Sequence, residues 1–150
     1  MVARKSLKGD FCPSARALDV IGDWWSLLIV RDAFDGLTRF SEFQKSLGIA
    51  KNILAERLKT LVASGILELV PASEDAVRMQ YRLTPMGKDL FPVIVALRQF
   101  GERHLFAPTE THSRLVDRAT GQSVRLDVRA KDGRLIGLDE AVILKVPQAE

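Results

Sequence analysis

The stretch RFSEFQKSLGIAKNILAERLKTLVA, residues 39–63, decides the fold of this 150-residue chain. Its apolar residues recur at helical spacing on both sides of Leu47-Gly48-Ile49-Ala50, which predicts helices over 41–47 and 50–63. Gly48 supplies the sharp reversal between them. Two helices joined by so short a turn are typical of a helix-turn-helix motif, whose second helix enters the major groove of DNA.

The two faces of helix 50–63 differ in chemistry. At about 100° per residue, apolar side chains converge on one side, which we assign to the core: Leu54, Leu58, Leu61 and Val62. Asn52, Glu56 and Lys59 lie on the opposite side, while Lys51 stands at the helix start and Arg57 on a flank. Asn can read adenine, and Lys or Arg can reach guanine or phosphate, so we expect this face to bind DNA. The alternative is an ordinary solvated helix face.

Charge supports the first interpretation. The chain has 22 basic and 19 acidic side chains, a formal net charge of +3. Residues 36–65 alone hold five basic side chains (Arg39, Lys45, Lys51, Arg57 and Lys59) against Glu42 and Glu56. A local basic excess favours a polyanionic partner, because phosphate neutralisation releases counterions.

On either side of this stretch, helix caps, prolines and turn residues predict the flanking elements. Cys12 before Pro13 predicts an N-cap and a helix over 14–21, and Asp23 caps a second helix over 24–35. Two strands, 67–71 and 78–83, form a hairpin whose polar turn is 72–76. Thr84-Pro85 opens a long helix to about Leu105 that we expect to kink at Pro92. The apolar stripe Val93, Leu97 and Phe100 runs along its second half.

Residues 107–150 change to a β pattern. We expect short strands over 114–118, 124–129, 135–136 and 142–146, with turns at Thr120-Gly121 and Asp132-Gly133. So small a sheet needs a surface to pack on. It would enlarge a dimer interface, or it would close a small-molecule pocket against the wing or the final helix.

The order of elements predicts an α+β winged helix-turn-helix fold: a helical core, a β-hairpin wing, a long C-terminal dimerisation helix and a small antiparallel β extension. We divide the chain into a DNA-binding and dimerisation domain, 1–106, and the extension, 107–150. No apolar run approaches the roughly 20 residues that span a bilayer, and the N-terminus is polar, so a cytoplasmic protein is expected.

Catalysis and metal binding are not indicated. His104 and His112 are the only histidines and have no accompanying cluster of ligands, so we predict no metal site and no cofactor. The sequence contains neither a phosphate-cradling glycine loop nor a nucleophile motif. Trp24 and Trp25 would line an effector pocket or, as is more common, serve in core and interface packing.

Several blocks resemble the HxlR-type winged helix-turn-helix transcriptional regulators, which are MarR-like. They are Cys12-Pro13, the run ALDVIGDWW at 17–25, RFSEF at 39–43, ILAERLKTL at 53–61, SGIL at 64–67, YRLTPMG at 81–87 and GERH at 101–104. The resemblance covers residues 11–106 in register. It implies a homodimeric DNA-binding regulator, with dimerisation through the first and last helices and a pseudo-palindromic double-stranded operator. We expect a repressor, although the sequence does not distinguish repression from activation.

On this basis we assign roles along the surface. Asn52, Glu56 and Lys59 face bases, while phosphates are held by Lys51, Arg57, Arg39 and Arg78. Two features depart from the family pattern. Ala50 stands where a Ser or Thr cap is usual, and the wing tip Ser73-Glu74-Asp75 is acidic rather than basic. Arg78 and Arg82 on the second strand are therefore better candidates for backbone contact than the tip.

Cys12 is the one cysteine and precedes a helix, whose macrodipole favours the reactive thiolate. In some members of the family the equivalent cysteine senses oxidants or electrophiles, and here any disulfide would join two chains. The alternative is a small packing residue that does not react. Regulation by an unidentified small molecule is also expected. The runner-up function is a protein–protein interaction module that keeps the winged-helix scaffold without binding DNA.

Overall fold

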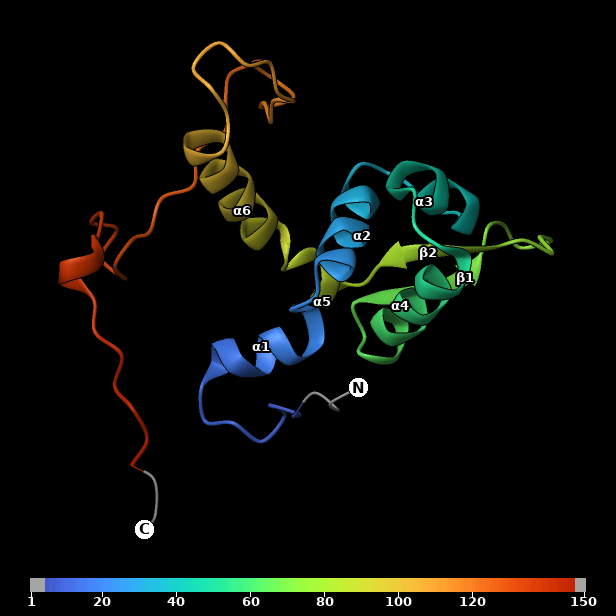
Figure 1. Cartoon of the computed structure of the whole chain (residues 1–150), viewed down its shortest axis with the longest axis horizontal. Coiled ribbons are helices and arrows are strands. Elements are labelled where there is room, and N and C mark those ends of the chain that lie inside the picture. Colours follow the sequence, from blue (N-terminus) through green and yellow to red (C-terminus); the bar gives the residue numbers. More distant parts are fainter. Residues whose placement is uncertain (1–4, 148–150) are drawn as a thin grey trace. The chain divides into compact units, whose positions relative to one another are not determined.

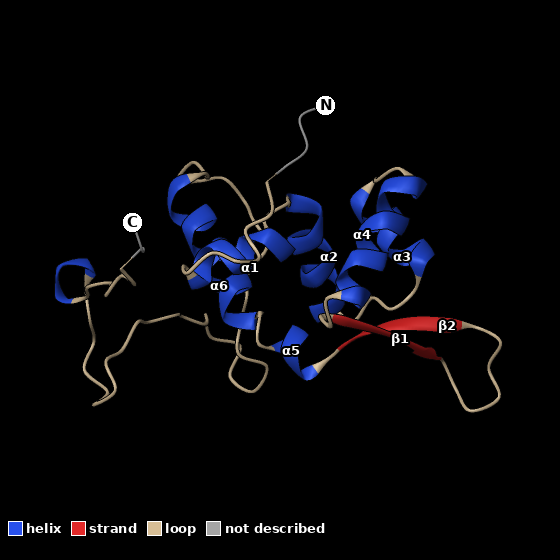
Figure 2. Ribbon diagram, turned by 90° about the horizontal axis from the view of Figure 1, so that it is seen from below, coloured by secondary structure: helices blue, strands red, loops and turns tan. Residues whose placement is uncertain are grey.

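The computed structural model describes residues 5–147. The chain forms two compact units, residues 1–91 and 92–150, and each is described by itself. The first unit contains four helices, the two-stranded wing and a short fifth helix, and the second contains the last long helix and the tail (Figures 1 and 2).

The first two helices begin where the caps predict. α1 spans Pro13–Ile21 with Cys12 as its N-cap and Pro13 in its first turn. α2 spans Trp24–Phe34, and the Asp23 carboxylate accepts a hydrogen bond from the Ser26 backbone N–H at 2.9 Å. Ile29 and Val30 of α2 are fully buried, so this helix lies at the centre of the hydrophobic core.

The helix-turn-helix forms as predicted. α3 spans Phe40–Leu47 and α4 spans Lys51–Ala63, and between them Gly48 adopts the left-handed conformation at φ 59°. Ile49 in the turn is buried, so the turn is packed and not merely a connection. On α4, Leu54, Leu58 and Leu61 are fully buried, which is the predicted core face.

The wing is a two-stranded antiparallel sheet. β1 (Leu67–Pro71) pairs with β2 (Met79–Leu83), with Leu67 opposite Leu83 and Glu68 opposite Arg82. The Tyr81 N–H donates to the Thr38 carbonyl at 2.8 Å, so the segment before α3 lies along the outer side of β2. This bond ties the wing to the helix-turn-helix.

The prediction of one kinked helix after the wing is wrong. The chain forms two helices, α5 (Pro85–Lys88) and α6 (Phe91–His104), separated by a turn. Within a continuous helix the Pro92 ring would meet the carbonyl of Lys88, four residues earlier, and it would remove a backbone donor. The first helix therefore ends at Lys88, and Pro92 lies in the first turn of the next, where its missing N–H costs nothing.

The predicted sheet in the tail does not form. Its pairing is reduced to two isolated bridges, Val116 with Ser123 and Arg129 with Leu135. The predicted turns do occur: Gly121 and Gly133 have φ of 69° and 89°. A short 3₁₀ turn, η1 (Leu138–Glu140), stands just before the expected last strand. Without a layer to cover one face, two-residue ladders do not extend into a sheet.

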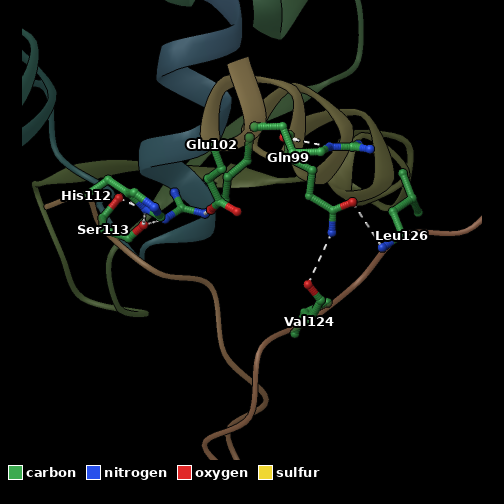
Figure 3. Close-up of polar contacts among 8 residues, drawn as sticks. Gln99, Glu102, His112, Ser113, Val124 and Leu126 are labelled. Atoms are coloured by element: carbon green, nitrogen blue, oxygen red, sulfur yellow. Dashed lines mark hydrogen bonds and ion pairs between the residues drawn. The ribbon is translucent and has the colours of Figure 1, made fainter. Parts of the chain in front are cut away.

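The first part of the tail is fastened to α6 by side chains (Figure 3). The Gln99 amide donates to the Val124 carbonyl at 3.1 Å and accepts from the Leu126 N–H at 3.3 Å, as a neighbouring strand would. Arg98 pairs with Glu102 at 3.2 Å and donates to the Ser113 hydroxyl at 2.8 Å. None of the helices within residues 5–147 combines the length and apolarity needed to cross a bilayer.

Candidate nucleic-acid interface

The outward face of α4 carries uncommitted polar side chains. Asn52, Glu56 and Lys59 are exposed on the side opposite the buried leucines, and Lys51 is exposed at the start of the helix. Within residues 5–147, Lys51, Asn52 and Lys59 have no side-chain hydrogen bond or ion pair. The side chains of two lysines and one asparagine on the exposed part of α4 are therefore free to meet a ligand.

The start of α4 adds backbone donors to this face. Ala50 is the N-cap and offers no side-chain acceptor, and the first helical bond runs from the Leu54 N–H to the Ala50 carbonyl at 3.0 Å. The preceding N–H groups of the first turn are left for solvent or an anion. The positive end of the helix macrodipole lies at the same place, beside Lys51.

Arg57 differs from its neighbours because it is already paired. Its Nε lies 3.4 Å from Oδ1 of Asp23, and its side chain is only one-third exposed. Asp23 is also the cap of α2, so one carboxylate serves both a helix terminus and the arginine. Sequence reasoning placed Arg57 on a flank correctly, but it gave no indication of this partner.

Arg39 stands at the entry to α3 with an exposed side chain. Its backbone N–H and that of Thr38 both donate to Oε2 of Glu42, at 3.0 and 2.9 Å. Both hydrogen bonds, the one from Thr38 most strongly, hold the pKa of Glu42 below its usual value. The carboxylate fixes the loop that presents Arg39.

The wing presents one free and one paired arginine. Arg78 is exposed before β2; its carbonyl accepts the Ala72 N–H at 2.9 Å, and its side chain has no hydrogen bond or ion pair within the described range, 5–147. Arg82 pairs with Glu68 on the facing strand, with Nη2 to Oε1 at 2.9 Å. That cross-strand pair follows from the register and could have been predicted from the hairpin. The acidic tip, Ser73 to Asp75, is exposed.

A small apolar hollow of about 240 Å³ lies between α3, α4 and the wing. It is lined by Phe40, Ala55, Lys59, Val62, Leu69 and Tyr81. The Tyr81 and Phe43 rings pack edge to face, with their centroids 6.3 Å apart. Burial raises the pKa of Tyr81. Sequence reasoning did not anticipate this hollow, because its lining comes from four separate elements.

The other residues that the sequence singled out, Cys12 and the tryptophans, do not belong to the α4 surface. Cys12 is a free, exposed thiol whose backbone N–H donates to Asp10 at 2.8 Å. Trp24 is 72% exposed and touches Trp25 edge to face at 5.9 Å, so it is not part of the core. No group of three potential metal ligands occurs among residues 5–147.

A recognition helix held by a buried leucine face, a left-handed glycine turn and a two-stranded wing together define the winged helix-turn-helix class. Residues 20–108 match the model of the HxlR-like helix-turn-helix family, and the chain belongs to that family.

Relatives and solved structures agree with this membership. An uncharacterized HTH-type transcriptional regulator of Mycobacterium tuberculosis, Rv3095, is 46% identical over 93 residues, which is 62% of this chain and 59% of the relative. This chain thus matches less than two thirds of the length of that relative. The crystal structure of PA1607, described as a candidate transcription factor, is 56% identical with a TM-score of 0.89, covering 95% of this chain and all of the other.

The reduced form of the redox regulator HypR is also similar. It is 29% identical with a TM-score of 0.58, covering 63% of this chain and 94% of the HypR chain. The similarity to HypR is thus confined to about two thirds of this chain, whereas that to PA1607 extends through most of the tail.

Proposed function

We propose that this protein is a sequence-specific DNA-binding transcriptional regulator that acts as a homodimer, with α4 of each copy in a major groove. The observation that carries the proposal is the outward face of α4, where Lys51, Asn52 and Lys59 are exposed and unpaired. Arg57 and Arg82 are instead paired with carboxylates. Unpaired cations can neutralise phosphates, and so release the counterions condensed on a polyanion, without first breaking an internal ion pair.

Base reading is assigned to the middle of the face. Asn52 has the donor and acceptor pair that recognises adenine, Lys59 suits guanine, and Glu56 suits cytosine. Phosphates are assigned to Lys51 with the free N–H groups of the first turn, and to Arg39 and Arg78 on either side. Arg57 and Arg82 reach phosphates only by leaving or sharing Asp23 and Glu68.

Twofold symmetry of the dimer gives a pseudo-palindromic operator with half-sites about one helical turn apart. Such a protein represses when its site overlaps a promoter, which is the mode we expect. Control by a small molecule remains a prediction from the sequence.

The test begins with an operator selected from randomised duplex. Lys51→Ala should weaken binding to every sequence and reduce the slope of log affinity against log salt by about 1. Asn52→Ala should relax preference at one base position at a cost of about 1–3 kcal/mol. Lys88→Ala, which removes an exposed lysine on α5, is the matched control and should change neither quantity. Unchanged operator binding in both α4 variants would refute the placement of the recognition helix.

A scaffold that binds another protein instead of DNA is the alternative, motivated by the acidic wing tip, Glu74 and Asp75. The two functions differ in salt dependence. A DNA-binding protein retains weak, salt-sensitive affinity for random duplex, whereas a pure adaptor has almost none at any salt concentration.

Oxidation at Cys12 is a second candidate function, favoured by its exposure and by the similarity to the redox regulator HypR. With one cysteine per chain, the products would be a sulfenic acid, a mixed disulfide or a bridge between two copies. Mass spectrometry after mild peroxide treatment, with operator binding measured on the same sample, tests this. Unchanged affinity at complete oxidation would dismiss Cys12 as a sensor.

A further inference from the structure

The last described part of the tail, residues 127–147, leaves nearly all of its side chains exposed, many of them apolar; we name it the arm. In Figures 1 and 2 it leads away from α6 and carries η1. Seven of its eight large apolar side chains are between about half and nine-tenths exposed, and Ile136 is partly buried; the seven are Val128, Leu135, Leu138, Val142, Ile143, Leu144 and Val146. Folded chains rarely leave so many neighbouring apolar side chains in water without a partner.

Apart from the pair that Asp127 makes with the adjacent Arg125 at 2.9 Å, the arm makes no polar contact with the rest of the described chain. Within the range 5–147, every hydrogen bond and ion pair of residues 128–147 is made inside the arm, such as Ile136 N–H to Val128 O at 3.0 Å and Arg134 to Glu140 at 3.0 Å. The preceding segment is different, because Gln99 fastens Val124 and Leu126 to α6 (Figure 3). The attachment to α6 therefore ends where the arm begins.

The composition of the arm indicates what kind of surface covers it. Residues 127–147 contain four basic and four acidic side chains, so the arm has no excess charge for a polyanion. Residues 142–146 are apolar except for Lys145, which suits a segment covered on both sides by protein. The arm is a shared structural feature as well, because PA1607 matches 95% of this chain, which includes most of the tail.

A surface of the same character lies uncovered on α6. Val93, Leu97 and Phe100 follow one another at helical spacing and are 39%, 50% and 58% exposed. One chain therefore carries two uncovered apolar surfaces, and a twofold axis lets each copy cover the other's surface reciprocally. The exchange of two arms, each with seven such side chains, supplies much of the roughly 1,200–2,000 Å² that specific interfaces bury.

We propose that the arm packs on a second copy of this chain, against the stripe formed by Val93, Leu97 and Phe100, and that two copies exchange arms. The proposal rests on the homodimer of the proposed function and extends it by assigning the tail a role in assembly. It is independent of which residues touch DNA.

Isotope-mixed cross-linking tests the exchange on the full chain. A photoreactive benzoylphenylalanine replaces Leu144, and light and heavy-isotope chains are unfolded together, refolded and irradiated. Arm exchange predicts cross-links from position 144 to α6, with as many joining a light to a heavy chain as joining like chains. Cross-links confined to single chains would overturn the proposal, and so would the absence of any cross-link, which would leave the arm free for a different partner.

A pair of matched substitutions tests its contribution to assembly. Ile143→Ser should raise the dimer dissociation constant about tenfold or more, because burying an aliphatic side chain accounts for at least that factor. Lys131→Ser changes an exposed lysine outside residues 142–146 and should leave the constant within about twofold. Equal dissociation constants in the two variants would overturn the proposal. Operator binding above the dissociation constant should survive in both variants, so a failure of arm exchange is distinguishable from a failure of DNA binding.

Discussion

Gly87 gives the sharpest prediction, because a side chain there has no space. A Cβ atom built on Gly87 would lie 2.1 Å from the Ile66 carbonyl oxygen and 3.0 Å from Cδ2 of Leu83. The obstacle is backbone and not the end of a flexible side chain. That carbonyl also accepts the Thr84 N–H at 3.1 Å, where α5 joins the wing. Gly87→Ala must therefore displace the junction of β1, β2 and α5.

The expected cost follows from those contacts. Overpacking a filled site costs about 1–3 kcal/mol, and weakening the Thr84 hydrogen bond adds about 1 kcal/mol. We expect a loss of about 3 kcal/mol in the free energy of unfolding. With a typical urea slope near 2 kcal/mol per molar, the unfolding midpoint should fall by roughly 1.5 M.

Gly48→Ala is the matched control, since Gly48 has open space around it but a left-handed φ of 59°. An alanine there incurs backbone strain alone, about 1 kcal/mol. Urea unfolding, monitored by tryptophan fluorescence, gives the free energy of unfolding of both variants for a direct comparison. If Gly87→Ala lost no more stability than Gly48→Ala, the Ile66 carbonyl would have to move freely, and the reasoning would be refuted.

Three further predictions concern individual side chains. Backbone hydrogen bonds lower the pKa of Glu42 from its ordinary 4.5, so the stability they confer is present above pH 4.5 and is lost as the pH falls through the lower folded pKa. Glu42→Gln should therefore flatten the acid side of the stability profile in urea titrations, and an unchanged slope would contradict this. Burial raises the pKa of Tyr81, the only tyrosine, so its ultraviolet titration should have a midpoint above 10.0 in the folded chain and near 10 in urea. The corresponding stability is present below pH 10 and is lost as the pH rises through the folded pKa; equal midpoints would refute the burial argument. Gln99→Met keeps the bulk of the side chain but removes both bonds to the tail, so amide exchange at Leu126 should accelerate about tenfold, and unchanged exchange would show that the clamp holds nothing.

Local chemistry made the first unit predictable. Asp23 and Gly48 act through their own backbone neighbourhood, so α2, α3 and α4 begin and end within about a residue of where caps and turns placed them. The buried and exposed faces of α4 followed from helical periodicity alone. The roles assigned to those exposed residues stay predictions.

Interactions between distant residues were the part that sequence could not supply. The prolines after the wing were visible, but whether Pro92 kinks a helix or starts a new one depends on the Lys88 carbonyl four residues earlier. In the tail, alternation predicted strands, yet alternation does not show whether a covering layer exists. The pairing of Arg57 with Asp23 joins residues 34 positions apart and leaves no local pattern.

That last pair sets a condition on any duplex that docks against α4. The Asp23 carboxylate lies 3.4 Å from Nε of Arg57, where it would compete with a phosphate for the guanidinium. If α4 binds DNA as proposed, a phosphate reaches Arg57 only when Asp23 is displaced or shared, and this free-energy cost is the same at correct and incorrect sites. The ratio of the affinities for correct and incorrect sites would be preserved, while the residence time on nonspecific DNA would be shortened.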